Sequence, residues 1–245
     1  MEKPYLSVII PAYNESKRLS PTLVDMDKKL SQVDFSYEIL IVNDGSKDST
    51  AEMAERLTHI VKNLRLIDNK ENHGKGWVVR QGMLEAKGEI RLFTDADNST
   101  SIDQFSKMIP YFKQGYQVVI GSRDVEGAQL IPAQPWYKSL AGDMGNLVIQ
   151  ILLLWGMWDT QCGFKAFTAE AAEKIFHLAK IDRWSFDVEI LSLAKKLNYK
   201  IKEIPVVWVN DAMSHVKASA YIQFFMEVFK IKWWMMTGKY KITSH

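Results

Sequence analysis

The sequence lacks the features that mark secreted and membrane-spanning proteins. Cys162 is its single cysteine, so no disulfide can form within the chain, and a reducing compartment is expected. No N-terminal signal segment is recognised, because a strand-like apolar run begins almost at once. The longest apolar run, Leu147–Trp158, is shorter than the roughly 18 residues that a spanning helix needs. We therefore expect a cytoplasmic protein with no spanning helix.

The sequence also has little excess of positive over negative charge. The formal net charge is +2, which gives no argument for a nucleic-acid partner, and none is predicted. Hydrophobic residues make up 47% of the 245 residues and charged residues 24%, proportions that are ordinary for a folded protein. A chain of this length and composition can bury the core of one large domain. The sequence gives no information on oligomeric state.

Apolar runs alternate with helix-like segments in the first half of the chain. Strand-like runs lie at Leu6–Ile10, Tyr37–Val42, Leu64–Asp68, Glu89–Thr94 and Val118–Gly121. Helical spacing is found at Lys17–Leu30, Ser49–Val61, Lys75–Lys87 and Ile102–Gln114. This order predicts an α/β fold with a mostly parallel, Rossmann-like sheet and helices on both faces. Polar clusters at Pro11–Glu15, Asn43–Ser46 and Asp95–Asn98 each follow a strand, so they should converge at one edge of the sheet.

The second half is less regular. The patterns predict helices at Trp136–Trp158, Ala169–His177 and Phe186–Lys196, and strands at Gly163–Thr168 and Ile201–Val209. We interpret residues 1–220 as one domain, with residues 1–125 as its first half and residues 126–220 as its second half. Residues 221–245 are interpreted as an amphipathic tail.

The most informative short motif is the acidic doublet Asp95 and Asp97. In an extended segment these two side chains project to the same side. Two neighbouring carboxylates repel each other unless a cation lies between them, and hard oxygen ligands suit Mg²⁺ or Mn²⁺. The doublet therefore predicts a metal site for a diphosphate, with Asp95 and Asp97 as ligands.

Several motifs together resemble a known family. The segments S-V-I-I-P-A-Y-N-E (Ser7–Glu15), I-V-N-D-G-S-K-D-S-T (Ile41–Thr50), N-H-G-K-G (Asn72–Gly76) and T-D-A-D (Thr94–Asp97) resemble the family 2 inverting glycosyltransferases with the GT-A fold. Later segments resemble the polyprenyl-phosphate members, and in particular the dolichyl-phosphate β-glucosyltransferases: G-S-R (Gly121–Arg123), D-T-Q-C-G-F-K-A-F (Asp159–Phe167), R-W-S-F-D-V-E-I-L (Arg183–Leu191) and E-I-P-V-V-W (Glu203–Trp208). The resemblance covers nearly the whole chain.

The resemblance implies a nucleotide-sugar donor, with UDP-glucose as the expected one, bound by residues 1–125, whereas residues 126–220 form the acceptor side. It implies a nucleoside pocket lined by Pro11, Ala12, Tyr13 and Glu15. Asp44 is expected to hydrogen-bond the base, and Lys75 to reach the nucleotide phosphate. Asp95 is expected near the ribose and the metal, and Asp97 as the direct metal ligand.

The acceptor implied by the resemblance is a polyprenyl phosphate. Such a phosphate has a second pKa near about 6, so it is already an oxyanion at neutral pH and needs cations rather than a base. Arg123 is the natural candidate, with Lys138 or Lys165 as helpers. Asp187 and Glu189 would then orient the sugar or steady the cations. If the acceptor is a hydroxyl group instead, Asp187 becomes the general base.

A membrane surface is the expected partner of the tail. Tyr221–Tyr240 combines tryptophans and other apolar residues with lysines, which is typical of a helix that lies in the plane of a membrane interface. Leu147–Trp158 could be a second element of this kind. The protein is thus expected to be peripheral, at the cytoplasmic face of a membrane.

Other functions stay open at this point. A polyprenyl-phosphate mannosyltransferase using GDP-mannose, and a family 2 enzyme acting on a glycan or protein hydroxyl, share the same donor chemistry. A catalytically silent nucleotide-sugar sensor has no chemical need for Asp95, Asp97 and Arg123. A nucleotidyltransferase would typically show a glycine-rich, basic loop after its first strand, and Pro11–Glu15 has none.

Overall fold

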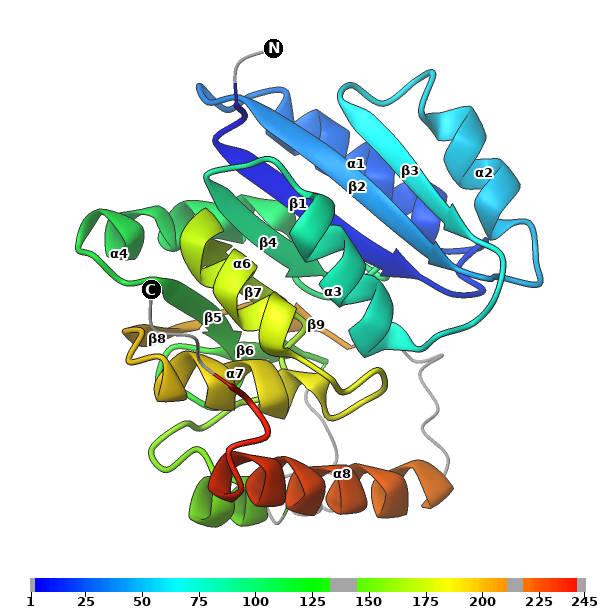
Figure 1. Cartoon of the computed structure of the whole chain (residues 1–245). Coiled ribbons are helices and arrows are strands. Elements are labelled where there is room, and N and C mark those ends of the chain that lie inside the picture. The colour runs from blue at the N-terminus through cyan, green and yellow to red at the C-terminus, as the bar shows by residue number, and fades with distance from the viewer. Residues whose placement is uncertain (1–2, 133–144, 211–217, 242–245) are drawn as a thin grey trace.

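A seven-stranded sheet forms the centre of the protein (Figure 1). The computed structural model describes residues 3–132, 145–210 and 218–241. The strands lie in the order β3 (Leu64–Asn69), β2 (Tyr37–Asp44), β1 (Leu6–Ala12), β4 (Ile90–Thr94), β7 (Phe164–Thr168), β5 (Val118–Ser122) and β8 (Ile201–Pro205). All neighbouring pairs are parallel except the two made by β7, which runs antiparallel to β4 and β5. The predicted mostly parallel α/β sheet is confirmed.

Helices cover both faces of the sheet, which explains why its central strands are almost entirely buried. Every residue of β1 is buried. Val8 and Ile10 belong to the core under α1 (Leu19–Leu30) and α2 (Thr50–Leu57), whereas Ile9 packs in the opposite core, against α3 (Lys75–Glu85). Successive side chains of the strand thus alternate between two hydrophobic cores, one on each face of the sheet.

The second half of the chain builds a layer beside the α3 face. It contains α6 (Ala169–Leu178), α7 (Phe186–Lys196), a helix at 145–152 and α8 (Ala218–Met236). Figure 1 shows α8 at the outer edge of the molecule, beyond α7 and far from β3. Its inward residues Val228 and Ile231 are completely buried. None of the helices in the described ranges combines the length and the apolar character that crossing a bilayer requires.

Three predicted elements differ from the structure. The single strand expected at Ile201–Val209 is two strands, because the chain leaves the main sheet after Pro205 and β9 (Val207–Val209) pairs with β6 (Gln129–Ile131), which was not predicted. The helix expected at Ile102–Gln114 is divided into a 3-10 helix, η1 (Ile102–Lys107), and α4 (Ile109–Lys113), whose first turn contains a proline. Of the expected helix Trp136–Trp158 the described part is helical only at 145–152, and residues 136–144 lie outside the described ranges.

Candidate active site

The acidic doublet lies at the exit of β4, as the sequence predicts. Ala96, between the two aspartates, is buried, and its carbonyl accepts a hydrogen bond of 2.8 Å from Thr22 Oγ1. Asp95 and Asp97 are both partly exposed. Asp97 Oδ1 accepts the backbone N–H of Ser99 at 2.9 Å, which fixes the turn after the strand. The local chain thus anchors the middle residue and leaves both carboxylates partly accessible to solvent.

Lys75 joins this doublet from the first turn of α3. Its Nζ lies 2.5 Å from Asp95 Oδ1. Burial opposes the charged form of Lys75, but the carboxylates of Asp95, Asp187 and Asp97 outweigh it and raise the pKa of this ammonium. The lysine is therefore held as a cation beside the acidic doublet.

Asp44 shapes the loop that delivers Lys75. It lies at the end of β2, is almost fully buried, and accepts Asn72 Nδ2 at 2.8 Å, the N–H of His73 at 2.7 Å and the N–H of Gly74 at 3.0 Å. Gly74 has a φ of +104° and precedes the first residue of α3. Asp44 thus fixes the conformation from which α3 begins.

The residues after β1 border the same edge of the sheet. Pro11 and Ala12 are buried at the end of β1, whereas Tyr13 is 40% exposed. Glu15 accepts two hydrogen bonds from Arg18, at 2.6 and 2.7 Å. Burial raises the pKa of Glu15, and the charges of Asp97 and Asp95 act in the same direction against the effect of Arg18. Glu15 therefore lies within electrostatic reach of the doublet.

A buried ion pair lies on the other side of Lys75. Lys165, on β7, has no exposed surface, and its Nζ lies 2.6 Å from Asp187 Oδ1 and 2.5 Å from the carbonyl oxygen of Cys162. Burial raises the pKa of Asp187, and the cations Lys165 and Lys75 oppose this rise. The predicted residues Lys75, Asp95 and Asp187 thus form one charged cluster with Lys165.

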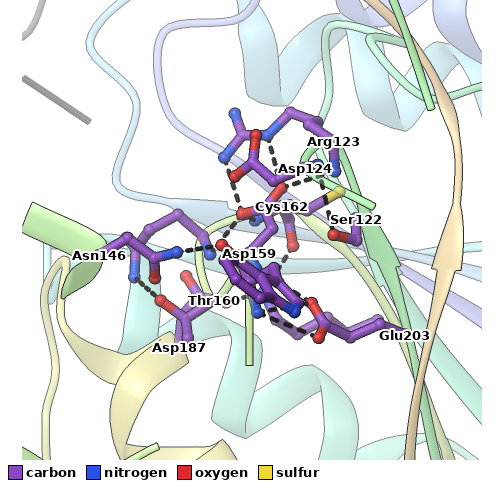
Figure 2. Close-up of polar contacts among 12 residues, drawn as sticks. Ser122, Arg123, Asp124, Asn146, Asp159, Thr160, Cys162, Asp187 and Glu203 are labelled. Carbon is purple, nitrogen blue, oxygen red and sulfur yellow. Dashed lines mark hydrogen bonds and ion pairs between the residues drawn. The ribbon is translucent and has the colours of Figure 1, made fainter. Parts of the chain in front are cut away.

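Arg123 lies in a second polar network, at the end of β5 (Figure 2). Its Nε and Nη2 donate to the two carboxylate oxygens of Asp159, at 2.7 and 2.9 Å, and its backbone N–H donates to Asp159 at 3.0 Å. The guanidinium also lies 4.9 Å from the ring centre of Trp208. Burial alone would lower the pKa of Arg123 and raise that of Asp159, but the pairing reverses both directions. Arg123 is therefore a fixed cation whose charge is largely balanced by one carboxylate.

Two further carboxylates support this network and were not predicted as site residues. Asp159 also accepts the N–H groups of Gln161 and Cys162. Glu203, on β8, accepts the N–H groups of Trp158 and Asp159, each at about 3 Å. Both carboxylates lie within sequence segments that carry the family resemblance, so the motifs contained the signal, although the pairing between them could not be known without the fold.

Gly163 is a third residue that sequence reasoning missed. A methyl group at this position would lie 2.0 Å from Asp95 Oδ2. The missing side chain leaves the space that the Asp95 carboxylate occupies.

One expected contributor, Glu189, is not part of the cluster. Glu189 is completely buried and accepts the N–H groups of Lys180 and Ile181 together with the hydroxyl of Tyr240 at 2.6 Å. Side chains two positions apart on a helix differ in direction by about 200°, so Glu189 points away from Asp187. The prediction that Glu189 orients the sugar or steadies the cations is therefore wrong. Lys138 lies outside the described residues.

The acidic doublet fits a hard divalent cation. Two partly exposed carboxylates lie two residues apart at the exit of β4 and both act on Lys75, and Asp95 fills a space that a Cβ on residue 163 would close. Across residues 3–132, 145–210 and 218–241 there is no group of three or more histidine, cysteine or acidic residues arranged to hold a metal. Mg²⁺ and Mn²⁺ commonly bind through one or two carboxylates and fill their remaining positions with water and substrate phosphates, so two aspartates are sufficient.

Comparisons with known proteins agree with this architecture. Residues 7–176 match the family model described as "Glycosyl transferase family 2". A dolichyl-phosphate beta-glucosyltransferase of Dictyostelium discoideum is 39% identical over 98% of this chain and 77% of its own length. The human dolichyl-phosphate beta-glucosyltransferase is 32% identical over 97% and 78%.

A solved structure gives the same picture of the fold. It is glucosyl-3-phosphoglycerate synthase from Mycobacterium tuberculosis, in complex with Mn²⁺, UDP and glucosyl-3-phosphoglycerate. It is 15% identical, covers 98% of this chain and 81% of its own, and has a TM-score of 0.63. At this identity the match concerns the fold, and the predicted GT-A fold is confirmed. The chain is a glycosyltransferase, and it belongs to glycosyl transferase family 2 together with the dolichyl-phosphate beta-glucosyltransferases.

Proposed function

We propose that the protein transfers glucose from UDP-glucose to a polyprenyl phosphate such as dolichyl phosphate, with inversion at the sugar carbon. The names and coverage of the relatives support the reaction class. The observation that carries the proposal is the Lys75–Asp95 ion pair beside Asp97 at the exit of β4. This arrangement offers one fixed cation and two carboxylates to a diphosphate and its metal.

On the donor side, Lys75 approaches a phosphate oxygen of the nucleotide. Asp97 and Asp95 would hold Mg²⁺ or Mn²⁺, and the presence of Mn²⁺ with UDP in a structural neighbour supports the choice of metal. The metal, when bound, offsets the negative charge that develops on the departing UDP. Pro11, Ala12, Tyr13 and Glu15 border the nucleoside.

Asp44 has acceptor capacity left for the base. A carboxylate offers about four lone-pair positions. The chain itself fills three of them, through Asn72 and the N–H groups of His73 and Gly74. The remaining position suits the imide N–H of uracil.

On the acceptor side, the lipid phosphate is already charged. One of its oxygens forms a bond to the anomeric carbon while the bond from that carbon to the UDP oxygen breaks, and UDP leaves with the electron pair. No proton has to be removed from the nucleophile, because the second pKa of a phosphate monoester is near about 6. Arg123, held in a fixed orientation by Asp159, is the group that binds this phosphate.

The structure favours the phosphate acceptor over a hydroxyl acceptor. A hydroxyl would require Asp187 as a general base. Asp187 is 5% exposed and its carboxylate is bonded to Lys165 within the protein. We infer that Asp187 instead keeps Lys165 and Lys75 in position near the sugar.

A lipid acceptor requires the protein to meet a membrane. Five large apolar residues of α8 are between 58% and 71% exposed and repeat at intervals of three and four residues: Ile222, Met226, Phe229, Trp233 and Met236. This spacing forms one stripe along the helix, opposite the buried Val228 and Ile231. We infer that the stripe lies in the interface of the cytoplasmic leaflet, as a peripheral contact.

Product analysis tests the proposal directly. The purified protein is incubated with Mn²⁺, a short-chain polyprenyl phosphate and either UDP-glucose or GDP-mannose, and the lipid products are identified by mass spectrometry. We expect a glucosyl phosphoryl lipid with UDP-glucose. A product only with GDP-mannose, or transfer only to water-soluble hydroxyl acceptors, would contradict the proposal.

A further inference from the structure

A lysine-lined groove opens on the surface between three helical elements. It has a volume of about 280 Å³ and lies where α7, α8 and the helix at 145–152 meet. Its apolar wall is formed by Leu152, Leu153 and Met235, and its rim by Lys195, Lys196 and Lys232. Figure 1 shows α7 and α8 adjacent in this region, on the side of the molecule away from β1–β3.

The three lysines give the groove a concentrated positive charge. Lys195 and Lys196 belong to the last turn of α7, and Lys232 comes from α8. Among the described residues, none of the three forms an ion pair with a carboxylate; Lys195 donates only to the carbonyl oxygen of Trp155, at 3.3 Å. Three cations that have no acidic partner within the described part of the chain, placed around an apolar wall, suit an anion that carries hydrocarbon.

The groove adjoins the apolar stripe of α8. Lys232 and Met235 lie on the same helix as Trp233 and Met236, which are 65% and 71% exposed. A second set of exposed apolar residues lies on the helix at 145–152 and just after it: Leu147, Ile151, Trp155 and Trp158. A methyl group on Gly145 would touch the Phe225 ring at 3.9 Å, and Leu152 shares the groove with Met235, so the two helical elements run side by side.

We propose that the groove binds the phosphate of an anionic phospholipid while the stripe of α8 inserts among the acyl chains of the same bilayer. The charge of the rim and the exposed tryptophans next to it match the two layers of a membrane interface. The proposal deepens the membrane contact proposed above, and it concerns a structural phospholipid rather than the polyprenyl phosphate that reacts.

The alternative occupant is a second copy of this chain. A two-fold dimer formed through this face would place the same surface on both sides of the contact. The lysine rims would then approach each other, and like charges brought together oppose association. The rim therefore favours a bilayer over a self-contact.

Vesicle sedimentation tests the groove. The probes are vesicles of phosphatidylcholine alone and vesicles of phosphatidylcholine and phosphatidylserine in equal parts. The variant carries Lys195→Gln, Lys196→Gln and Lys232→Gln. A matched control carries Lys62→Gln, Lys87→Gln and Lys113→Gln, which removes the same charge from exposed lysines away from the groove.

The expected result is a selective loss of anionic binding. A lysine near an anionic surface contributes about 1 kcal/mol, so the groove variant should bind the mixed vesicles about 100-fold more weakly, at 1.4 kcal/mol per tenfold. The control variant should lose far less, and binding to pure phosphatidylcholine should be nearly equal for all three proteins. Inorganic phosphate should not displace the protein from mixed vesicles beyond the effect of chloride at the same ionic strength.

Three results would overturn the proposal. The first is an equal loss of binding in the groove variant and the control. The second is displacement by inorganic phosphate alone, which would identify a free-phosphate site. The third is a lipid-free dimer that dissociates when Trp233 is changed to glutamine.

The assay is separate from catalysis. Glucose transfer to a short-chain acceptor in solution should be the same in the groove variant and the wild type. If neither protein transfers glucose, the proposed reaction is refuted. The vesicle assay still tests whether the groove binds an anionic phospholipid.

Discussion

The space beside Asp95 gives a sharp prediction, because a single methyl group fills it. In Gly163→Ala the new Cβ would lie 2.0 Å from Asp95 Oδ2, 2.6 Å from its Cγ and 2.9 Å from Oδ1. Ordinary contact between such atoms is about 3.5 Å. The Asp95 carboxylate must therefore move by more than about 1 Å, which disturbs its ion pair with Lys75 Nζ.

The magnitude follows from the geometry. Misplacing a group in an active site by about 1 Å can cost about 100-fold in rate. We expect kcat for glucose transfer to fall by about that factor, equivalent to about 2.7 kcal/mol. The Mn²⁺ concentration that gives half-maximal rate should rise as well, because one of the two metal-binding carboxylates is displaced.

The assay compares initial rates at saturating UDP-glucose over a range of Mn²⁺ concentrations. Gly145→Ala is a matched control, since among the described residues its methyl group would meet only the Phe225 ring, at 3.9 Å, and Gly145 has no positive φ. Thermal unfolding of both variants shows whether the fold is intact. A Gly163→Ala protein with the wild-type kcat and metal dependence would refute the role assigned to Asp95.

Three further predictions concern other parts of the site. Asp97→Ala should abolish metal-stimulated transfer while the far-UV circular dichroism spectrum stays unchanged; activity that still responds to Mn²⁺ would contradict its role as ligand. Arg123→Ala should weaken transfer to the lipid phosphate much more than hydrolysis of UDP-glucose, and equal losses of the two rates would exclude an acceptor contact. The pairing with Arg123 lowers the pKa of Asp159, so on acidification the unfolded state takes up this proton first and the stability due to the pair is lost below about pH 4. Urea midpoints measured from pH 6 downward should therefore fall less steeply in the double variant Arg123→Met, Asp159→Leu, and an unchanged slope would refute the assignment.

Much of the sheet could be predicted because its strands are buried on both faces. Runs such as Leu6–Ile10 and Tyr37–Val42 read as continuous apolar segments, and helical spacing separates them. The strand pattern also predicts that Asp44 and Asp95, which both follow strands, lie at the same edge of the sheet. The structure confirms the element type at each of these positions.

The contacts that hold the candidate site could not be predicted in the same way. The Lys165–Asp187 pair joins residues from β7 and α7, and the Arg123–Asp159 pair joins residues 36 positions apart. No periodic pattern encodes such long-range pairs, since each depends on how separate elements pack. Gly163 is a similar case, because only the position of the Asp95 side chain reveals why a side chain at 163 is costly.

Strand β7 has a mechanical consequence. It is hydrogen-bonded to β4 on one edge and to β5 on the other, so chain segments from the first and second halves alternate within one sheet. A rigid-body rotation of the first half of the chain against the second would break the backbone hydrogen bonds that β7 makes with β4 and β5. Any conformational change during turnover should therefore be confined to the loops at the strand ends, and turnover should be sensitive to loop stiffness rather than to a hinge across the sheet.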